Sequence, residues 1–170
     1  MVLPLLAQRA VLSLTTFPTV TGWYQVAGIT LATTVSAGLV AAGTGFVDPM
    51  RDWDPPTNPL KPLSALVFPS LFEEVLWRGA LLPHPSAIIT SGSKSLLVLL
   101  PWACGVLVVH VLMHPVAAVT IWPRGRAVFG DARFLVLATL VLGGATASYI
   151  VSGGSAWAAA LTHGIPVALW

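Results

Sequence analysis

The stretch LFEEVLWRGALLPHP, Leu71 to Pro85, places two adjacent glutamates and an arginine inside a run of apolar residues. The rest of the chain has the same apolar character, because 56% of its 170 residues are hydrophobic and only 8% are charged. Soluble domains carry about 25% charged residues. We therefore interpret the chain as a polytopic membrane protein in which Glu73, Glu74 and Arg78 need a specific reason to be present.

The basic residues are scattered along the chain. The chain has eight lysines and arginines and six acidic residues, which gives a formal net charge of +2. The basic residues form no run of five or six like charges. Proteins that bind the phosphate backbone of a nucleic acid usually do so with a cluster of basic residues. The sequence therefore argues against a nucleic-acid partner. The single cysteine, Cys104, lies in the apolar run PWACGVLVV and is expected to pack as a small apolar side chain rather than to act as a nucleophile.

Apolar blocks near the length of a membrane span organise the chain. A hydrocarbon core about 30 Å thick needs about 20 apolar residues in a helix. The expected spans are Trp23–Val47, Pro62–Leu82, Leu96–Ile121 and Phe134–Val151, followed by the short block Ser155–Trp170, which barely reaches across. The predicted fold class is all-α, a membrane helix bundle of four to five hydrophobic spans with a polar cluster buried between three of them.

Polar segments separate these blocks and suggest the domain organisation. Asp48–Pro62 contains five prolines, three aspartates, one arginine and one lysine, so it is expected to be an aqueous loop. Pro83–Lys94 is expected to be the next loop. We divide the chain into an N-terminal interfacial or partly spanning segment, residues 1–22, and a membrane domain, residues 23–170, whose motif-bearing core covers about 60–170.

The three charges in the opening stretch are not equivalent. An ionised side chain at the centre of a bilayer costs about 2.5 to 3.5 kcal/mol. Glu74 and Arg78 are spaced i, i+4 with the acid first, which favours an ion pair within the helix. Glu73 is rotated by about 100° from Glu74, and Trp77 stands at its own i+4 position. Glu73 therefore needs a partner from another helix.

The ionisable side chains of other apolar blocks that could meet Glu73 are histidines. His110 and His114 lie one helical turn apart, and His163 lies in the last block. A carboxylate with two or three imidazoles can bind a metal or activate water for hydrolysis. The same groups can instead hydrogen-bond one another and hold helices together. His84, between Pro83 and Pro85, is expected to be a solvated loop residue.

Three short motifs occur in order on three of the expected spans. The first, FPSLFEEVLWRGALLPHP, contains two glutamates, three further residues and an arginine, namely Glu73, Glu74 and Arg78. The second, HVLMH, has a large residue followed four positions later by a histidine, namely His110 and His114. The third, LTHGIPVALW, contains a histidine in the last block.

On these motifs, the segment from about Leu60 to Trp170 resembles the CAAX-protease and bacteriocin-processing family, also called CPBP or Abi. It looks most like the short branch of that family found in cyanobacteria and plastids. Two positions depart from the family pattern. His110 stands where phenylalanine is usual, and Val167 stands four residues after His163, where asparagine or another small polar residue is usual.

The resemblance implies a membrane-embedded endopeptidase. Carried over to this chain, Glu73 is the general base, His114 is its partner, and His163 is an oxyanion-stabilising or orienting group. Glu74 and Arg78 fix the helix that presents Glu73. Because the family has been described both as metalloproteases and as metal-free glutamate proteases, two expectations stay open. One is a divalent metal such as zinc at Glu73, His114 and His163, and the other is a metal-free site.

Three functions stay open. The leading one is an intramembrane endopeptidase acting on a hydrophobic or membrane-associated peptide, integral to a bacterial inner membrane or to a thylakoid or plastid membrane. The alternative is a catalytically weak or inactive family member that acts as a membrane interaction or assembly factor. Val167 offers no oxyanion donor and Pro166 removes a backbone donor, which favours this alternative, whereas His110 could supply a donor or could simply pack in place of phenylalanine. A small ion or proton carrier would need a continuous polar path, which the fourth span lacks.

Overall fold

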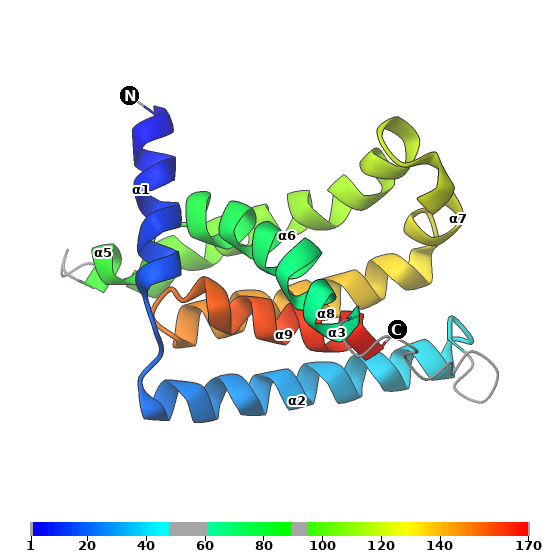
Figure 1. Cartoon of the computed structure of the whole chain (residues 1–170), viewed down its shortest axis with the longest axis horizontal. Helices are drawn as coiled ribbons and strands as arrows, with labels where there is room; N and C mark the ends of the chain where they lie inside the picture. Colours follow the sequence, from blue (N-terminus) through cyan, green and yellow to red (C-terminus); the bar gives the residue numbers. More distant parts are fainter. Residues whose placement is uncertain (1, 48–60, 90–94, 170) are drawn as a thin grey trace.

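The computed structural model describes residues 2–47, 61–89 and 95–169, and within these ranges it contains helices and turns but no strand. The expected loop Asp48–Pro62 falls largely outside these ranges. The all-α fold class is confirmed. The elements, shown in Figure 1, are α1 (Val2–Thr15), α2 (Val20–Gly43), α3 (Lys61–Ala65), η1 (Leu66–Leu71), α4 (Phe72–Glu74), η2 (Val75–Ala80), α5 (Pro85–Ile89), α6 (Ser95–Thr120), η3 (Pro123–Gly125), α7 (Arg126–Phe129), α8 (Ala132–Val151) and α9 (Ala156–Leu169).

Three helices of the described chain are long and apolar enough to cross a membrane, namely α2, α6 and α8. They correspond to the expected spans Trp23–Val47, Leu96–Ile121 and Phe134–Val151. The last block forms the shorter apolar helix α9, and the N-terminal segment contains the similarly short α1. Figure 1 shows α2, α8 and α9 running side by side, with α1 standing across one end of this layer.

The remaining expected span, Pro62–Leu82, is a series of short helical pieces rather than one continuous helix. Phe68 has an extended backbone, with φ −138° and ψ 120°, and Pro69 follows it. A residue that precedes proline is biased away from the helical region, and proline has no N–H to donate. The chain therefore starts a new helical segment after Phe68. That segment includes the π-helical turn η2, whose i→i+5 pattern differs from that of an α-helix.

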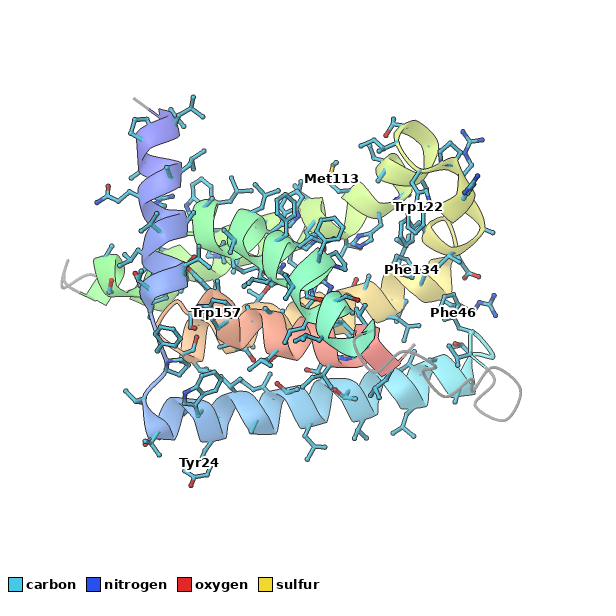
Figure 2. All side chains as sticks on the ribbon, in the orientation of Figure 1. Tyr24, Phe46, Met113, Trp122, Phe134 and Trp157 are labelled. Carbon is cyan, nitrogen blue, oxygen red and sulfur yellow. The ribbon has the colours of Figure 1, made fainter. Side chains whose placement is uncertain are left out.

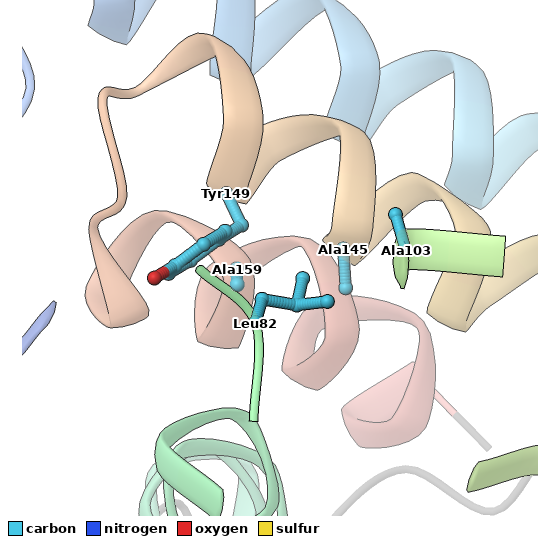
Figure 3. Packing of buried hydrophobic residues seen from close by; sticks show 5 residues of the cluster. All are labelled: Leu82, Ala103, Ala145, Tyr149 and Ala159. Atoms are coloured by element: carbon cyan, nitrogen blue, oxygen red, sulfur yellow. The ribbon is translucent and has the colours of Figure 1, made fainter. Parts of the chain in front are cut away.

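Small residues bring α2 close to α8. The buried face of α2 includes Ala37 and Ala41, which pack against Leu137 and Val141 of α8. A Cβ atom added at Gly144 of α8 would overlap the side chain of Thr33. Small residues allow this close helix contact in membrane proteins. A second cluster, drawn in Figure 3, joins α6, α8, α9 and the turn after η2 through Leu82, Ala103, Ala145, Tyr149 and Ala159.

Hydroxyl groups also link the helices of this layer. Thr162 of α9 hydrogen-bonds both Thr30 of α2 and Ser148 of α8, each with an oxygen–oxygen distance of 2.7 Å. All three residues are buried. Thr162 also donates to the carbonyl of Ala158 in its own helix, so the network satisfies the backbone as well. These contacts fix α9 between α2 and α8.

The N-terminal helix α1 is attached to the core where η2 ends. Ser13 of α1 is fully buried, and a Cβ atom at Gly79 would overlap it, so the two backbones touch closely. Trp157 of α9 donates its indole N–H to the carbonyl of Leu14 at 2.9 Å. Thr16, the residue after α1, lies within hydrogen-bond distance of His84, with 3.3 Å between its Oγ1 and the His84 Nε2.

Two predictions from the sequence were wrong. His84 is only 3% exposed rather than solvated, because Thr16 and Tyr149 cover it. Its Nδ1 accepts a hydrogen bond from the backbone N–H of Ser86 at 3.3 Å, and burial lowers the pKa of its imidazole although a backbone hydrogen bond with Gly154 opposes this effect. Cys104 of α6 is exposed, although it was expected to pack as a small apolar side chain.

Candidate active site

A cluster of ionisable side chains lies between the helical segment 72–80, α6 and α9. The residues that the sequence singled out all contribute to it: Glu73 and Glu74 from α4, Arg78 from η2, His110 and His114 from α6, and His163 from α9. The expected polar cluster between three helical segments is therefore present. Within it, the two adjacent glutamates have different partners.

Glu74 and Arg78 form the predicted ion pair in the buried part of the cluster. The Arg78 Nη1 donates to Glu74 Oε1 at 3.0 Å, and both side chains are fully buried. The same guanidinium donates to the carbonyl of Leu142 at 2.7 Å and, through Nε and Nη2, to the hydroxyl of Thr146 at 3.2 Å. Leu142 and Thr146 belong to α8, so Arg78 joins the glutamate segment to that helix. No motif or spacing in the sequence indicated this role of Thr146.

His163 contacts Glu74 rather than Glu73. Its Nδ1 lies 2.9 Å from Glu74 Oε1, and the ring is 5% exposed. Because a carboxylate only accepts hydrogen bonds, the imidazole N–H is the donor. Glu74 Oε1 therefore accepts from both His163 and Arg78, whereas Oε2 has no hydrogen-bond partner among the described residues.

Glu73 finds its partner on α6, as its lack of an intrahelical partner predicted. His110 Nε2 lies 3.1 Å from Glu73 Oε2. The Glu73 side chain is 26% exposed, in contrast to the fully buried Glu74. His110 itself is buried and stacks on Trp77, with ring centroids 4.6 Å apart and an interplanar angle of 15°. Trp77 was visible in the sequence as the i+4 neighbour of Glu73, but its stacking role was not.

His114 completes the group near Glu73. Its Nδ1 faces the backbone carbonyls of His110 and Val111 at 3.2 and 3.3 Å, so Nδ1–H is the donor and Nε2 is left as an acceptor. The ring makes edge contacts with Phe129 and Phe134, at centroid distances of 5.4 and 5.3 Å. Figure 2 shows Phe134 with Phe46 and Trp122 at the α7 end of the molecule. An aromatic cluster thus holds His114 in its orientation.

One atom of each of Glu73, His110 and His114 lies within 4.8 Å of the others, which is close enough to consider a shared metal ion. A histidine that binds a metal through one nitrogen donates its other N–H to an acceptor. Arg78 Nη1, which can only donate, lies 2.8 Å from His110 Nδ1. His110 Nε2 therefore carries the proton and is not a ligand atom. The expected third ligand, His163, faces Glu74 instead. The donor set does not fit the expected metal site.

An apolar groove of about 490 Å³ opens on the surface between η2 and α6. It adjoins the cluster through Trp77, whose ring lies against His110. Its lining contains no charged residue and consists of Trp77, Leu81, Pro101, Trp102, Gly105, Val106 and Val109.

The fold and the cluster together define a class of protein, an integral membrane helix bundle with a carboxylate–imidazole site between its helices. The family described as Type II CAAX prenyl endopeptidase Rce1-like matches residues 55–168, which include every residue of the cluster. The chain belongs to this family, a family of proteases, as the motifs predicted. No match was found among the curated proteins or among the solved structures.

Proposed function

We propose that the protein is an intramembrane endopeptidase in which Glu73 is the general base that activates water. The observation that carries this proposal is the different environment of the two glutamates. Glu74 is fully buried and accepts from Arg78 and His163, whereas Glu73 is 26% exposed and has one hydrogen-bonded oxygen. A base must reach the proton that it removes. Glu73 meets this condition and Glu74 does not.

In the proposed reaction, Glu73 takes a proton from a water molecule while the oxygen of that water attacks the peptide carbonyl. His114, one ring nitrogen of which lies within 4.8 Å of a Glu73 carboxylate oxygen, orients the same water. The proton then passes from Glu73 to the departing amine, so that one peptide bond is broken and one water is consumed. His163 is the proposed orienting group rather than an oxyanion donor, because it donates its Nδ1–H to Glu74 and a neutral imidazole has no second N–H.

The proposed substrate is a hydrophobic or membrane-associated peptide. The apolar groove beside Trp77 supports this choice, since it leads from the exposed face of α6 to the ring on which His110 stacks. The family description is that of a CAAX prenyl endopeptidase, so a lipidated peptide and an unmodified apolar peptide are both suitable test substrates.

The test uses Glu73→Gln and Glu73→Ala in reconstituted vesicles with these two peptides. Loss of a general base typically lowers the rate about 10²- to 10⁴-fold. We expect both variants to lose processing while their thermal unfolding in detergent stays close to that of the parent. Asp131→Asn, a carboxylate at the N-terminus of α8 outside the cluster, is the matched control and should retain processing. Parent-like cleavage by both Glu73 variants would remove Glu73 as the base.

A second candidate function is a non-catalytic membrane assembly factor. It is favoured by the apolar Val167 and by the buried Pro166 beside it, which together remove two hydrogen-bond donors next to His163. Under this alternative, Glu73→Gln leaves partner co-purification and the cellular phenotype intact. Under the peptidase proposal, the same variant loses the phenotype that depends on cleavage.

A further inference from the structure

The proton position on His110 follows from its neighbours. A guanidinium has only N–H donors, so the 2.8 Å contact with Arg78 Nη1 makes His110 Nδ1 an acceptor. A neutral imidazole then carries its proton on Nε2. That nitrogen lies 3.1 Å from Glu73 Oε2, to which it donates. Arg78, His110 and Glu73 thus form one directed chain of hydrogen bonds.

We propose that His110 is a positioning residue that holds the Glu73 carboxylate through its Nε2–H. This inference rests on the proposed role of Glu73 as the base. With Oε2 held, Oε1 is the oxygen left to take a proton from water. The hydrogen bond also fixes the carboxylate plane relative to His114, one helical turn along α6.

The surroundings of His110 make this arrangement rigid. The ring is 2% exposed and is stacked between Trp77 and His114, with centroid distances of 4.6 and 5.6 Å. Arg78, which orients it, is fixed by Glu74 and by the α8 carbonyl of Leu142. A hydrogen bond whose donor is itself polarised by a charged neighbour is strengthened in a buried site. The buried guanidinium therefore acts on Glu73 through the imidazole between them.

Phenylalanine would fill the same stacked position without donating a hydrogen bond. The aromatic contacts of the ring therefore do not account for a histidine at this position. Glutamine, by contrast, can place an amide oxygen toward Arg78 and an amide N–H toward Glu73. The pair His110→Phe and His110→Gln thus separates ring packing from hydrogen bonding.

The first measurement is kinetic. A hydrogen bond to a charged group contributes about 1.5 to 3 kcal/mol, which corresponds to a rate effect of about 10- to 100-fold. We expect His110→Phe to lower kcat by this factor with an unchanged KM, and His110→Gln to restore most of it. A role limited to packing predicts the reverse order, because phenylalanine preserves the stacked ring better than glutamine does.

The second measurement does not require hydrolysis. In the parent protein labelled with ¹⁵N-histidine, the His110 signals should show a protonated Nε2 and an unprotonated Nδ1, and Arg78→Met should alter the Nδ1 signal. Adding zinc should leave both signals unchanged, because the protonated Nε2 is not available as a ligand. The signals of the parent protein can be measured even if the His110 variants do not fold.

The outcomes separate the two proposals. If Glu73→Gln cleaves like the parent, the proposed function fails regardless of His110. If Glu73→Gln is inactive but His110→Phe cleaves like the parent, the positioning role alone is overturned. A protonated Nδ1 on His110, or a zinc-dependent change in its Nε2 signal, would also overturn it.

Discussion

Replacement of Arg78 by methionine tests whether the buried ion pair stabilises the fold. The change keeps a long side chain but removes the hydrogen bonds that Arg78 donates to Glu74, His110, Leu142 and Thr146. Interhelical hydrogen bonds in membranes average about 0.6 kcal/mol, so the three partners on α6 and α8 account for roughly 2 kcal/mol. The remaining effect comes from the buried Glu74 carboxylate, which is left with His163. Removal of one member of a buried pair costs about 3 to 5 kcal/mol in total, and we expect this loss.

The assay is unfolding in mixed micelles at increasing SDS content, followed by tryptophan fluorescence. The double variant Glu74→Gln with Arg78→Met removes the unpaired charge, so it should regain about 1 to 3 kcal/mol relative to Arg78→Met alone. Arg133→Met is the control. Arg133 pairs with Asp131 at 2.6 Å but is 45% exposed, so its loss should destabilise the protein far less than the loss of Arg78 does.

Two results would refute this reasoning. The first is a loss of less than about 1 kcal/mol for Arg78→Met, which would mean that the pair contributes no more than an exposed one. The second is a double variant that is no more stable than Arg78→Met, which would mean that the unpaired glutamate is not the source of the loss.

Two further predictions concern the apolar groove and the buried His84. A Cβ atom added at Gly105 would meet no atom within 4 Å, and Gly105 lines the groove, so a tryptophan there should fill the groove and Gly105→Trp should reduce peptide processing. Gly38→Trp on the exposed face of α2 should not reduce it, and equal effects of the two variants would count against the groove. The folded protein holds His84 neutral, because burial lowers its pKa from the ordinary value of 6.5. The unfolded chain therefore binds more protons below about pH 6.5, and stability should fall as the pH is lowered from there toward the folded pKa. His84→Gln should show a weaker pH dependence in thermal melts between about pH 7 and 5, and identical slopes for parent and variant would contradict this account.

Helical spacing was sufficient to predict the contacts made within one turn. Glu74 and Arg78 belong to consecutive turns of one segment, and the 3.0 Å contact confirms the ion pair expected from their i, i+4 spacing. The same spacing indicated that Glu73 faces away from this pair and needs a partner on another helix. His110 is that partner in the structure.

Contacts between helices could not be predicted at the same level. Which histidine meets which glutamate depends on the relative rotation and depth of three segments, and the break at Phe68 and the π-helical turn η2 both change that rotation. His163 was expected near Glu73 but contacts Glu74. The burial of His84 also escaped prediction, because it results from contacts with Thr16 and Tyr149, two residues distant from it in sequence.

The partners of Arg78 have a consequence for how the protein enters the membrane. Leu142 lies 64 residues after Arg78 and Thr146 lies 68 residues after it. At a synthesis rate of about 5 to 20 residues per second, roughly 3 to 14 seconds separate the appearance of the arginine from that of its acceptors on α8. During this interval the guanidinium can be satisfied only by its own segment, by α6 or by water. The hydrogen bonds from Arg78 to α8 therefore form only after the ribosome has delivered that helix, which couples the final packing of the glutamate segment to the arrival of α8.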